Sequence, residues 1–312
     1  MRDLFEGRNV SPMLIAEQKE PFDSKEYIYE FKYDGYRCIT YVDKETDIRS
    51  RQNNTMIKKF PELGNLHEQV SHRCILDGEL VILKNGIPDF DEIRRRASMT
   101  NNFKIVLTSD KFPATFIAYD ILYYKDQSVV NMPLMERKQL LQRVVKENNR
   151  IIISRYIEEH GIQLFNIAKG NRLEGIVAKK KNSSYELGKK SHHWIKCKVS
   201  CCIDAVVCGY LRKKDGMTNI IIGQYDDSEL IYKGHVALGA GMTHIKKHGF
   251  QQIDSSPFGY VPRGNEGAVW IKPNLVCMVE YKPTDRSTLR EAVFRGIRDD
   301  KLANECQVDN KN

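Results

Sequence analysis

The chain has 312 residues, which is long enough for two ordinary domains because a single hydrophobic core rarely serves more than about 250–300 residues. Hydrophobic residues make up 41% of the chain and charged residues 29%, a composition that excludes a disordered or a fibrous protein. The 49 lysines and arginines exceed the 41 acidic residues, and the net charge of +8 argues for a polyanionic partner.

The positive charge is concentrated in one part of the chain. The stretch from Lys179 to Lys214 contains ten lysines and arginines against Glu186 and Asp204, so its own net charge of +8 equals that of the whole protein. We therefore expect this stretch to meet the phosphate groups of the polyanion.

The sequence predicts a cytoplasmic protein without membrane contact. Residues 1–13 lack the apolar core of a signal peptide, and no apolar run approaches the ~18 residues that cross a bilayer. The eight cysteines are too sparse for a secreted disulfide scaffold and fit a reducing compartment. Four of them cluster without forming a CxxC pair, so we expect thiols there rather than a zinc site: Cys197, Cys201, Cys202 and Cys208.

Short strands with interleaved helices dominate the chain up to about residue 199. Apolar and alternating patterns predict strands at Tyr27–Phe31, Tyr36–Val42, Cys74–Leu83, Thr115–Tyr124 and Ile151–Ser154. Two amphipathic patterns predict helices at Met132–Asn148, with Pro133 near its start, and at Glu158–Lys169, with Gly170 to end it.

After Val199 the pattern changes to closely spaced strands. We predict strands at Ile203–Leu211, Asn219–Tyr225, Leu230–Leu238 and Leu275–Lys282, with a helix at Thr243–Phe250. Roughly 100 residues of mostly antiparallel strands favour a small five-stranded barrel of the OB type.

The segment Glu30–Arg37 (EFKYDGYR) places a lysine between two predicted strands. Lys32 precedes an Asp34–Gly35 turn, and Arg37 follows the lysine by five residues. A lysine held in this way offers an amine nucleophile, and the nearby cation can bind phosphate or ribose. The amine attacks only when neutral, so burial or neighbouring cations have to lower its pKa from about 10.4. Taken alone, the segment fits an ordinary hairpin with solvated charges better than a nucleophile site, because Asp-Gly turns are common.

Three further segments combine charges with apolar strands. Leu76–Leu80 (LDGEL) carries two carboxylates, which are costly to bury without a metal, a lysine or a ribose hydroxyl as partner. Leu173–Lys179 (LEGIVAK) repeats the pattern with an acid at a strand start. In Trp194–Lys198 (WIKCK), Lys196 and Lys198 point to one face, and two cations on one face need an anion between them. Each segment singly is compatible with an ordinary half-buried strand.

Together and in this order, these motifs resemble those of the covalent nucleotidyltransferases, meaning polynucleotide ligases and messenger-RNA capping enzymes. The finer similarity is to bacterial ATP-dependent DNA ligases of the kind associated with double-strand-break end joining. It spans about residues 26 to 301 and includes Ser50–Asn53 with Phe60–Leu63, Tyr185–Lys190 before Trp194, and Leu289–Arg290 with Phe294–Lys301. The resemblance implies an α+β nucleotidyltransferase (adenylation) domain of antiparallel sheets at residues 1–199 and an OB-fold β-barrel at residues 200–312.

The resemblance also implies roles for the charged residues. Lys32 would attack the α-phosphate of ATP and hold AMP as a phosphoramidate. Lys196 and Lys198 would grip that phosphate and lower the pKa of Lys32, and Lys179 would lie against phosphates as well. Glu174 would bind the catalytic Mg²⁺ or Mn²⁺.

The remaining implied roles concern the nucleoside, the leaving group and the DNA. Glu30 would face the adenine amine, Tyr119 would stack on the base, Arg37 and Glu79 would hold the ribose, and Glu79 would also reach the metal. Pyrophosphate would be oriented by Arg290, Asp300 and Lys301. Arg51 would read the 5′-phosphate of the nick, and Lys189 and Lys190 would contact the duplex.

The resemblance implies an ATP-dependent DNA ligase that seals 3′-hydroxyl/5′-phosphate nicks through lysyl-AMP and adenylated DNA, in DNA repair or non-homologous end joining. The expected partners are nicked duplex DNA and a Ku-like end-binding protein, and the expected state is a monomer.

Four alternatives are open at this point. A capping-type guanylyltransferase shares the lysine motif and the barrel but not the segment around Arg51, and an RNA ligase would differ in its substrate. A non-catalytic DNA-binding module would not need Lys32 or Glu174. An NAD-dependent ligase is disfavoured because only 31 residues precede Lys32 and no zinc-ligand array follows.

Overall fold

The computed structural model of the protein describes residues 3–18, 20–171, 173–199, 202–212, 217–238, 243–282 and 289–308. Contacts between residues divide the chain into two compact units, Met1–Val199 and Ser200–Asn312. Among the described residues, no helix is long and apolar enough to cross a membrane.

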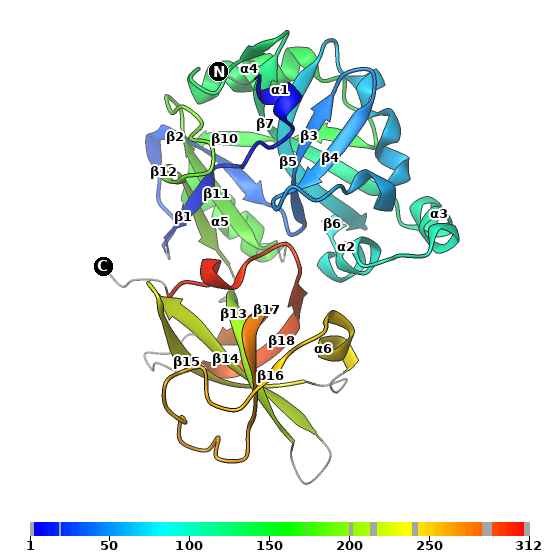
Figure 1. Cartoon of the computed structure of the whole chain (residues 1–312). Helices are drawn as coiled ribbons and strands as arrows, with labels where there is room; N and C mark the ends of the chain where they lie inside the picture. Colours follow the sequence, from blue (N-terminus) through cyan, green and yellow to red (C-terminus); the bar gives the residue numbers. More distant parts are fainter. Residues whose placement is uncertain are drawn as a thin grey trace. The chain divides into compact units, whose positions relative to one another are not determined.

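The first unit contains two β-sheets (Figure 1). The five-stranded sheet consists, in spatial order, of β1 (Leu14–Glu17), β12 (Lys190–Lys198), β11 (Gly175–Lys180), β2 (Ser24–Lys32) and β10 (Tyr156–Glu159). The seven-stranded sheet has the path β4 (Thr46–Ser50), β3 (Tyr36–Val42), β5 (Cys74–Lys84), β7 (Ala114–Tyr124) and β8 (Gln127–Ser128), with β6 (Ile87–Pro88) beside β5 and β9 (Ile151–Ile153) beside β7.

Short helices cover and connect these sheets. The α-helices are α1 (Leu4–Gly7), α2 (Phe90–Ala97), α3 (Asn102–Lys111), α4 (Leu134–Val144) and α5 (Gly161–Gly170), and the 3₁₀ helices are η1 (Ile57–Lys59) and η2 (Pro61–Gln69). α4 packs against β7, and α5 packs against β2 and β11 (Figure 1).

The five-stranded sheet is covered on both faces, and its side chains alternate between them. Tyr29 and Ile176 pack with Leu164 of α5 on one face. Ile28 and Trp194 belong to a second core that includes residues of the seven-stranded sheet. The face shared with Ile28 therefore looks toward the other sheet, and alternation along β2 places Glu30 and Lys32 there.

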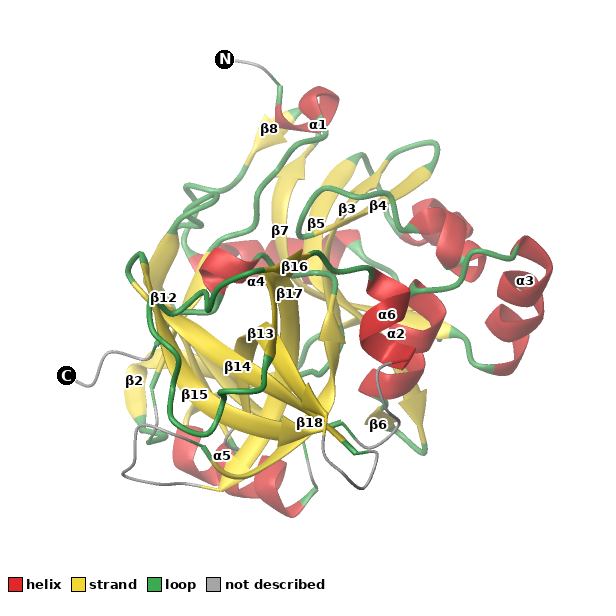
Figure 2. Ribbon diagram, turned by 60° about the horizontal axis from the view of Figure 1, so that its bottom comes forward, coloured by secondary structure: helices red, strands yellow, loops and turns green. Residues whose placement is uncertain are grey.

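The second unit is a closed five-stranded barrel (Figure 2). Its strands are β13 (Cys202–Arg212), β14 (Thr218–Asp226), β15 (Glu229–Ala237), β18 (Arg290–Arg298) and β17 (Val269–Lys282), and pairing of β13 with β17 closes the ring. β16 (Gln252–Ile253) pairs with β17, and the helices are α6 (Thr243–His248) and η3 (Ala303–Glu305). Buried aliphatic residues such as Val207, Ile222 and Val279 fill the core. The expected fold class, antiparallel sheets followed by an OB-type barrel, is confirmed.

All strands predicted from the sequence are present, but one helix boundary was wrong. Tyr156–Glu159 forms β10, which pairs with β2, and α5 begins only at Gly161. Glu159 has φ +67°, which an α-helix does not accommodate, so the predicted start at Glu158 is not possible. The other two predicted helices are also shorter than expected, at Leu134–Val144 instead of Met132–Asn148 and at Thr243–His248 instead of Thr243–Phe250.

A buried ion pair fastens α4 to β7. The Arg137 guanidinium donates to both carboxylate oxygens of Asp120 at 2.9 Å and to the Ser183 carbonyl at 2.9 Å, and both charged side chains are fully buried. Removing one partner of such a pair leaves an uncompensated buried charge.

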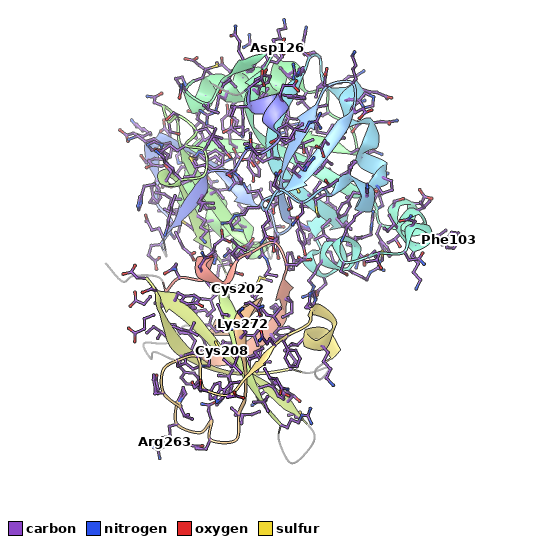
Figure 3. All side chains as sticks on the ribbon, viewed as in Figure 1. Phe103, Asp126, Cys202, Cys208, Arg263 and Lys272 are labelled. Atoms are coloured by element: carbon purple, nitrogen blue, oxygen red, sulfur yellow. The ribbon has the colours of Figure 1, made fainter. Side chains whose placement is uncertain are left out.

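We expect Asp120→Asn to lower the free energy of unfolding by about 3–5 kcal/mol, measured by thermal or denaturant unfolding. The matched control is Asp126→Asn. Asp126 pairs with Arg73 at the surface of the same unit, and its side chain is 70% exposed (Figure 3). A loss in Asp120→Asn no larger than that in the control would show that the buried pair does not stabilise the fold.

Candidate active site

Strand register brings four of the predicted site residues to one face of the five-stranded sheet. Lys32 pairs with Gly175, which in turn pairs with Lys198. Glu30 pairs with Val177, which pairs with Lys196. Because directly paired residues point to the same side of a sheet, Lys32, Glu30, Lys196 and Lys198 share the face that looks toward the seven-stranded sheet.

Lys32, the predicted nucleophile, ends β2 and forms an ion pair with Glu174. Its side chain is 21% exposed, so solvent and small molecules can reach it. Burial acts to lower the pKa of Lys32, but the charge of Glu174, helped by Glu79, outweighs it and the pKa is raised above 10.5. In the ligand-free chain the charges that act most strongly on Lys32 are carboxylates, so its pKa is raised rather than lowered as the sequence analysis expected.

The backbone at position 175, directly after Glu174, requires glycine. It has φ +152°, and a Cβ atom at this position would lie 2.1 Å from the Cys197 carbonyl oxygen. Any larger residue would push β11 away from β12. Glycine thus keeps Lys32 and Lys198 in one row across the sheet, with Gly175 between them and Glu174 beside Lys32.

The two lysines of β12 share one carboxylate. The Nζ atoms of Lys196 and Lys198 lie 2.6 Å and 3.3 Å from the two carboxylate oxygens of Glu17, on β1. Burial tends to raise the pKa of Glu17, but the two lysines outweigh it and the pKa is lowered. Glu17 is the anion that the sequence required between the two cations, although the sequence did not identify it.

Glu30 is buried between two lysines. Its Oε2 accepts from Nζ of Lys179 at 2.9 Å, and its Oε1 forms an ion pair with Lys138. Nζ of Lys179 also lies 3.9 Å from the ring centre of Trp194 and 4.6 Å from that of Tyr119. Burial lowers the pKa of Lys179 to about 8, with Glu30 opposing and Lys138 adding to the shift.

These contacts bear on one expectation and reveal one residue that sequence reasoning missed. Lys179 was predicted to lie against phosphates together with the lysine pair; in the ligand-free chain it contacts Glu30 and the rings of Trp194 and Tyr119. Lys138 was missed. It occupies an apolar position of α4, between buried Leu134 and Leu141. A lysine within the apolar face of this amphipathic helix was the sequence feature that could have indicated a buried charge.

The seven-stranded sheet contributes Arg37, which is held from several sides. It donates to the Asp77 carboxylate at 3.1 Å and 2.7 Å, and to the carbonyl of Met13 at 2.7 Å. The Tyr185 hydroxyl is within 3.2 Å of Arg37 and donates to Asp77 at 2.6 Å. Arg37 is thus the cation that the buried carboxylate of Asp77 needs as a partner. The sequence analysis named Tyr185 as part of a family motif but gave it no role.

Glu79 and Tyr119 lie beside Arg37. Arg37 pairs directly with Glu79 across β3 and β5, and its guanidinium carbon is 5.6 Å from the Tyr119 ring centre. Burial raises the pKa of Tyr119 well above 10, so its hydroxyl stays protonated. The ring of Tyr119 is half-buried and lies near Lys179, so it offers a neutral aromatic surface beside that lysine.

The other predicted residues lie outside this cluster or in the second unit. Arg51 directly follows β4, and Lys189 and Lys190 are exposed at the start of β12. In the second unit, Asp300 accepts from Arg298 at 2.7 Å and 2.6 Å, and Lys301 pairs with Asp204. Arg290 begins β18, but its side chain lies outside the described residues.

Comparison with known proteins gives matches over both units. The chain matches the family model of the ATP dependent DNA ligase domain at residues 12–198 and that of the ATP dependent DNA ligase C terminal region at residues 213–301. It is 34% identical over 292 residues to the SPbeta prophage-derived DNA ligase-like protein LigB of Bacillus subtilis, covering 93% of this chain and 99% of that protein.

A longer relative and a solved structure agree with this result. The chain is 27% identical over 320 residues to the multifunctional non-homologous end joining DNA repair protein LigD of Mycobacterium tuberculosis, covering 97% of this chain but only 40% of that protein. Mycobacterial DNA ligase D complexed with ATP and MES has the same fold, with a TM-score of 0.67 and 24% identity over 97% of this chain and 99% of that chain. The predicted resemblance is thereby confirmed, and the chain belongs to the family of ATP-dependent DNA ligases.

Proposed function

We propose that the chain seals nicks in duplex DNA in three steps, with Lys32 as the nucleophile of the first. Lys32 takes AMP from ATP and releases pyrophosphate. AMP then passes to the 5′-phosphate of the nick, and the 3′-hydroxyl displaces it. The single observation that carries this proposal is that Lys32, Lys196 and Lys198 share one sheet face with Glu174 beside the nucleophile.

In the first step the Nζ lone pair of Lys32 forms a bond to the α-phosphorus as the bond to pyrophosphate breaks. Lys32 must first lose a proton, because the ammonium has no lone pair, and the carboxylate of Glu174 is in contact with it. Lys196 and Lys198 supply positive charge for the phosphoryl oxygens. Displacement at phosphorus depends on such alignment and charge neutralisation more than on acid–base chemistry.

The part of this sheet face around Glu30 and Lys179 fits the nucleoside. Glu30 and Lys179 offer an acceptor and a donor to the edge of adenine, and Tyr119 offers a ring for stacking. Arg37 and Glu79, adjacent across β3 and β5, are proposed to bind the ribose.

The carboxylates beside Lys32 fit a divalent metal ion. Mg²⁺ is usually held by one or two carboxylates together with substrate phosphates rather than by a full protein cage. No group of three or more metal-ligating side chains occurs in the part of the chain that the structure describes. Glu174 and Glu79, whose charges both act on Lys32, match this sparse donor set, and they would hold Mg²⁺ or Mn²⁺. When bound, the metal supplies charge neutralisation at the transferring phosphoryl group.

Family membership supports roles for the residues outside the cluster. We assign Arg51 to the 5′-phosphate of the nick, and Arg290, Asp300 and Lys301 to the pyrophosphate leaving group. Because relatives named LigD are described as non-homologous end joining proteins, we propose a role in DNA repair by end joining, beside a Ku-like end-binding protein.

Nucleotide and substrate comparisons test the proposal. We expect covalent labelling with α-labelled ATP but not GTP, and sealing of a nicked DNA duplex but not of single-stranded RNA. Labelling by GTP would favour a capping-type enzyme. Sealing of the RNA alone would favour an RNA ligase, and neither labelling nor sealing would favour a non-catalytic DNA-binding module.

We expect the double variant Lys189→Glu/Lys190→Glu to bind nicked DNA at least about tenfold more weakly and to show a shallower dependence of affinity on salt, because fewer counterions are released on binding. Self-adenylation should be unchanged, since neither lysine contacts the cluster around Lys32. The matched control is Lys25→Glu/Lys146→Glu, which makes the same charge change at two other exposed lysines of the unit. Equal losses of affinity in the two double variants would mean that only net charge matters.

A further inference from the structure

Lys138 is a buried cation for which the proposed chemistry has no task. It lies on α4 and is 1% exposed, and its Nζ forms an ion pair with Oε1 of Glu30. The other oxygen of Glu30, Oε2, accepts from Lys179, which is 2% exposed. Two buried ammonium groups therefore hold one buried carboxylate, each by a different oxygen.

One cation would suffice to neutralise Glu30, and burying the second is costly. The charged groups facing Lys179 are Glu30, Lys138 and Asp120, and Asp120 is already paired with Arg137. The pair of lysines thus leaves an excess positive charge in the interior. We infer that the second lysine serves to fix the orientation of the Glu30 carboxylate, which a single ion pair would leave free to rotate.

The edge of adenine shows what orientation is needed. Adenine presents a donor at its exocyclic amine and an acceptor at N1, so it fits a carboxylate beside an ammonium group. Guanine presents an acceptor and then a donor at the same two positions. A site built from fixed polar partners rejects a base that leaves those partners unpaired.

We propose that Lys138 is a positioning residue for base selection: it fixes Oε1 of Glu30, so that Glu30 and Lys179 present a fixed acceptor and donor to adenine. This inference rests on the proposed function, in which Glu30 faces the adenine amine. Without Lys138, Glu30 can turn both oxygens toward Lys179 and form a closed neutral pair, and the base then loses both partners.

The test compares Lys138→Met, which removes the charge and keeps the chain length, with Lys138→Arg and with the control Lys146→Met just beyond α4. Formation of the nucleotide adduct is followed by intact-protein mass spectrometry with ATP, GTP and purine riboside triphosphate, which lacks the exocyclic amine. In Lys138→Met we expect KM for ATP to rise about tenfold, with the maximal rate within about threefold of the unmodified protein. Its preference for ATP over purine riboside triphosphate should fall by about tenfold, whereas Lys138→Arg and the control should keep it.

A pH profile adds a readout of the electrostatic coupling between Lys138 and Lys179. In the unmodified protein, KM for ATP should rise above about pH 8, where Lys179 loses its proton. Lys138 contributes to that low pKa, so the pKa of Lys179 should increase in Lys138→Met and the rise in KM should move to higher pH.

The outcomes separate this inference from the proposed function. An unchanged ATP preference and an unmoved alkaline limb in Lys138→Met would overturn the role of Lys138 while leaving ligation intact. Failure of the unmodified protein to form any adduct with ATP would overturn the proposed function itself. If Lys138→Met does not fold, two other measurements decide. Loss of the ATP preference in folded Lys138→Arg would contradict the inference. So would the absence of a rise in KM for ATP at alkaline pH in the unmodified protein.

Discussion

Lys32→Ala is expected to abolish self-adenylation, with a loss of at least about 10⁴-fold in the rate of covalent AMP incorporation from labelled ATP. The substitution removes the atom that forms the bond to the α-phosphorus. Lys196 and Lys198 lie on β12, two strands away from β2, and both are paired with Glu17. Neither of them can replace the nucleophile without leaving that carboxylate. Denaturing electrophoresis of the labelled protein measures the effect directly.

The later steps distinguish loss of the nucleophile from loss of the fold. Sealing of a nick that already carries AMP on its 5′-phosphate does not use Nζ of Lys32 as a nucleophile, so Lys32→Ala should retain it within about tenfold. Lys25→Ala, which changes an exposed lysine on the same strand β2, should leave all steps unchanged. Covalent AMP on the Lys32→Ala protein would contradict the assignment.

Glu174→Gln has the second largest expected effect, a loss of about 10²–10³-fold in single-turnover self-adenylation at saturating ATP and Mg²⁺. Glutamine preserves the side-chain volume beside Gly175 but removes the negative charge proposed to hold the metal. The same change removes the main charge that raises the pKa of Lys32. The variant therefore has more neutral Lys32 amine at a given pH. We expect it to react more slowly nevertheless, because the loss of metal binding by Glu174 is the larger effect.

The pH dependence separates these two contributions. Since the pKa of Lys32 lies above 10.5 in the ligand-free protein, the rate should rise by up to about tenfold per pH unit between about pH 7 and 9 if deprotonation limits it. In Glu174→Gln this rise should level off at lower pH. Glu26→Gln, an exposed carboxylate on β2 that pairs with Lys180, is the matched control. A Glu174→Gln protein as fast as the unmodified chain at every pH in this range would contradict the assignment of Glu174 as a metal ligand, because the lower pKa of Lys32 could offset lost metal binding only over part of it.

Much of the candidate site could be predicted because strand alternation is visible in the sequence. Lys196 and Lys198, two residues apart in an apolar run, had to share a face, and β12 has that geometry. The local pattern around Lys32 likewise predicted the strand, but residues 33–35 form an irregular link between β2 and β3, which lie in different sheets, rather than the predicted turn. Alternation along β12 therefore predicted that the two lysines share a face, whereas the role of Lys32 as nucleophile was implied by the family resemblance.

The partners of these residues could not be predicted, because they depend on pairing between distant segments. Glu17 reaches the lysines through the parallel pairing of β1 with β12, which contains a register shift between Ile15 and Ala16. Lys138 reaches Glu30 only because α4 packs on β7. Glu158 and Glu159, the end of β10, were predicted as a helix start for the same reason, since their pairing with β2 is a tertiary contact.

The most direct test of the account follows a single label from nucleotide to protein to DNA. The protein is incubated with α-labelled ATP and Mg²⁺, freed of nucleotide, and then mixed with a nicked DNA duplex. We predict that the label is first bound covalently at Lys32, then appears on the 5′-phosphate of the nick, and leaves as free AMP as the strands are joined. Sealing by the unmodified chain without any labelled protein intermediate would contradict the assignment of Lys32 as the nucleophile.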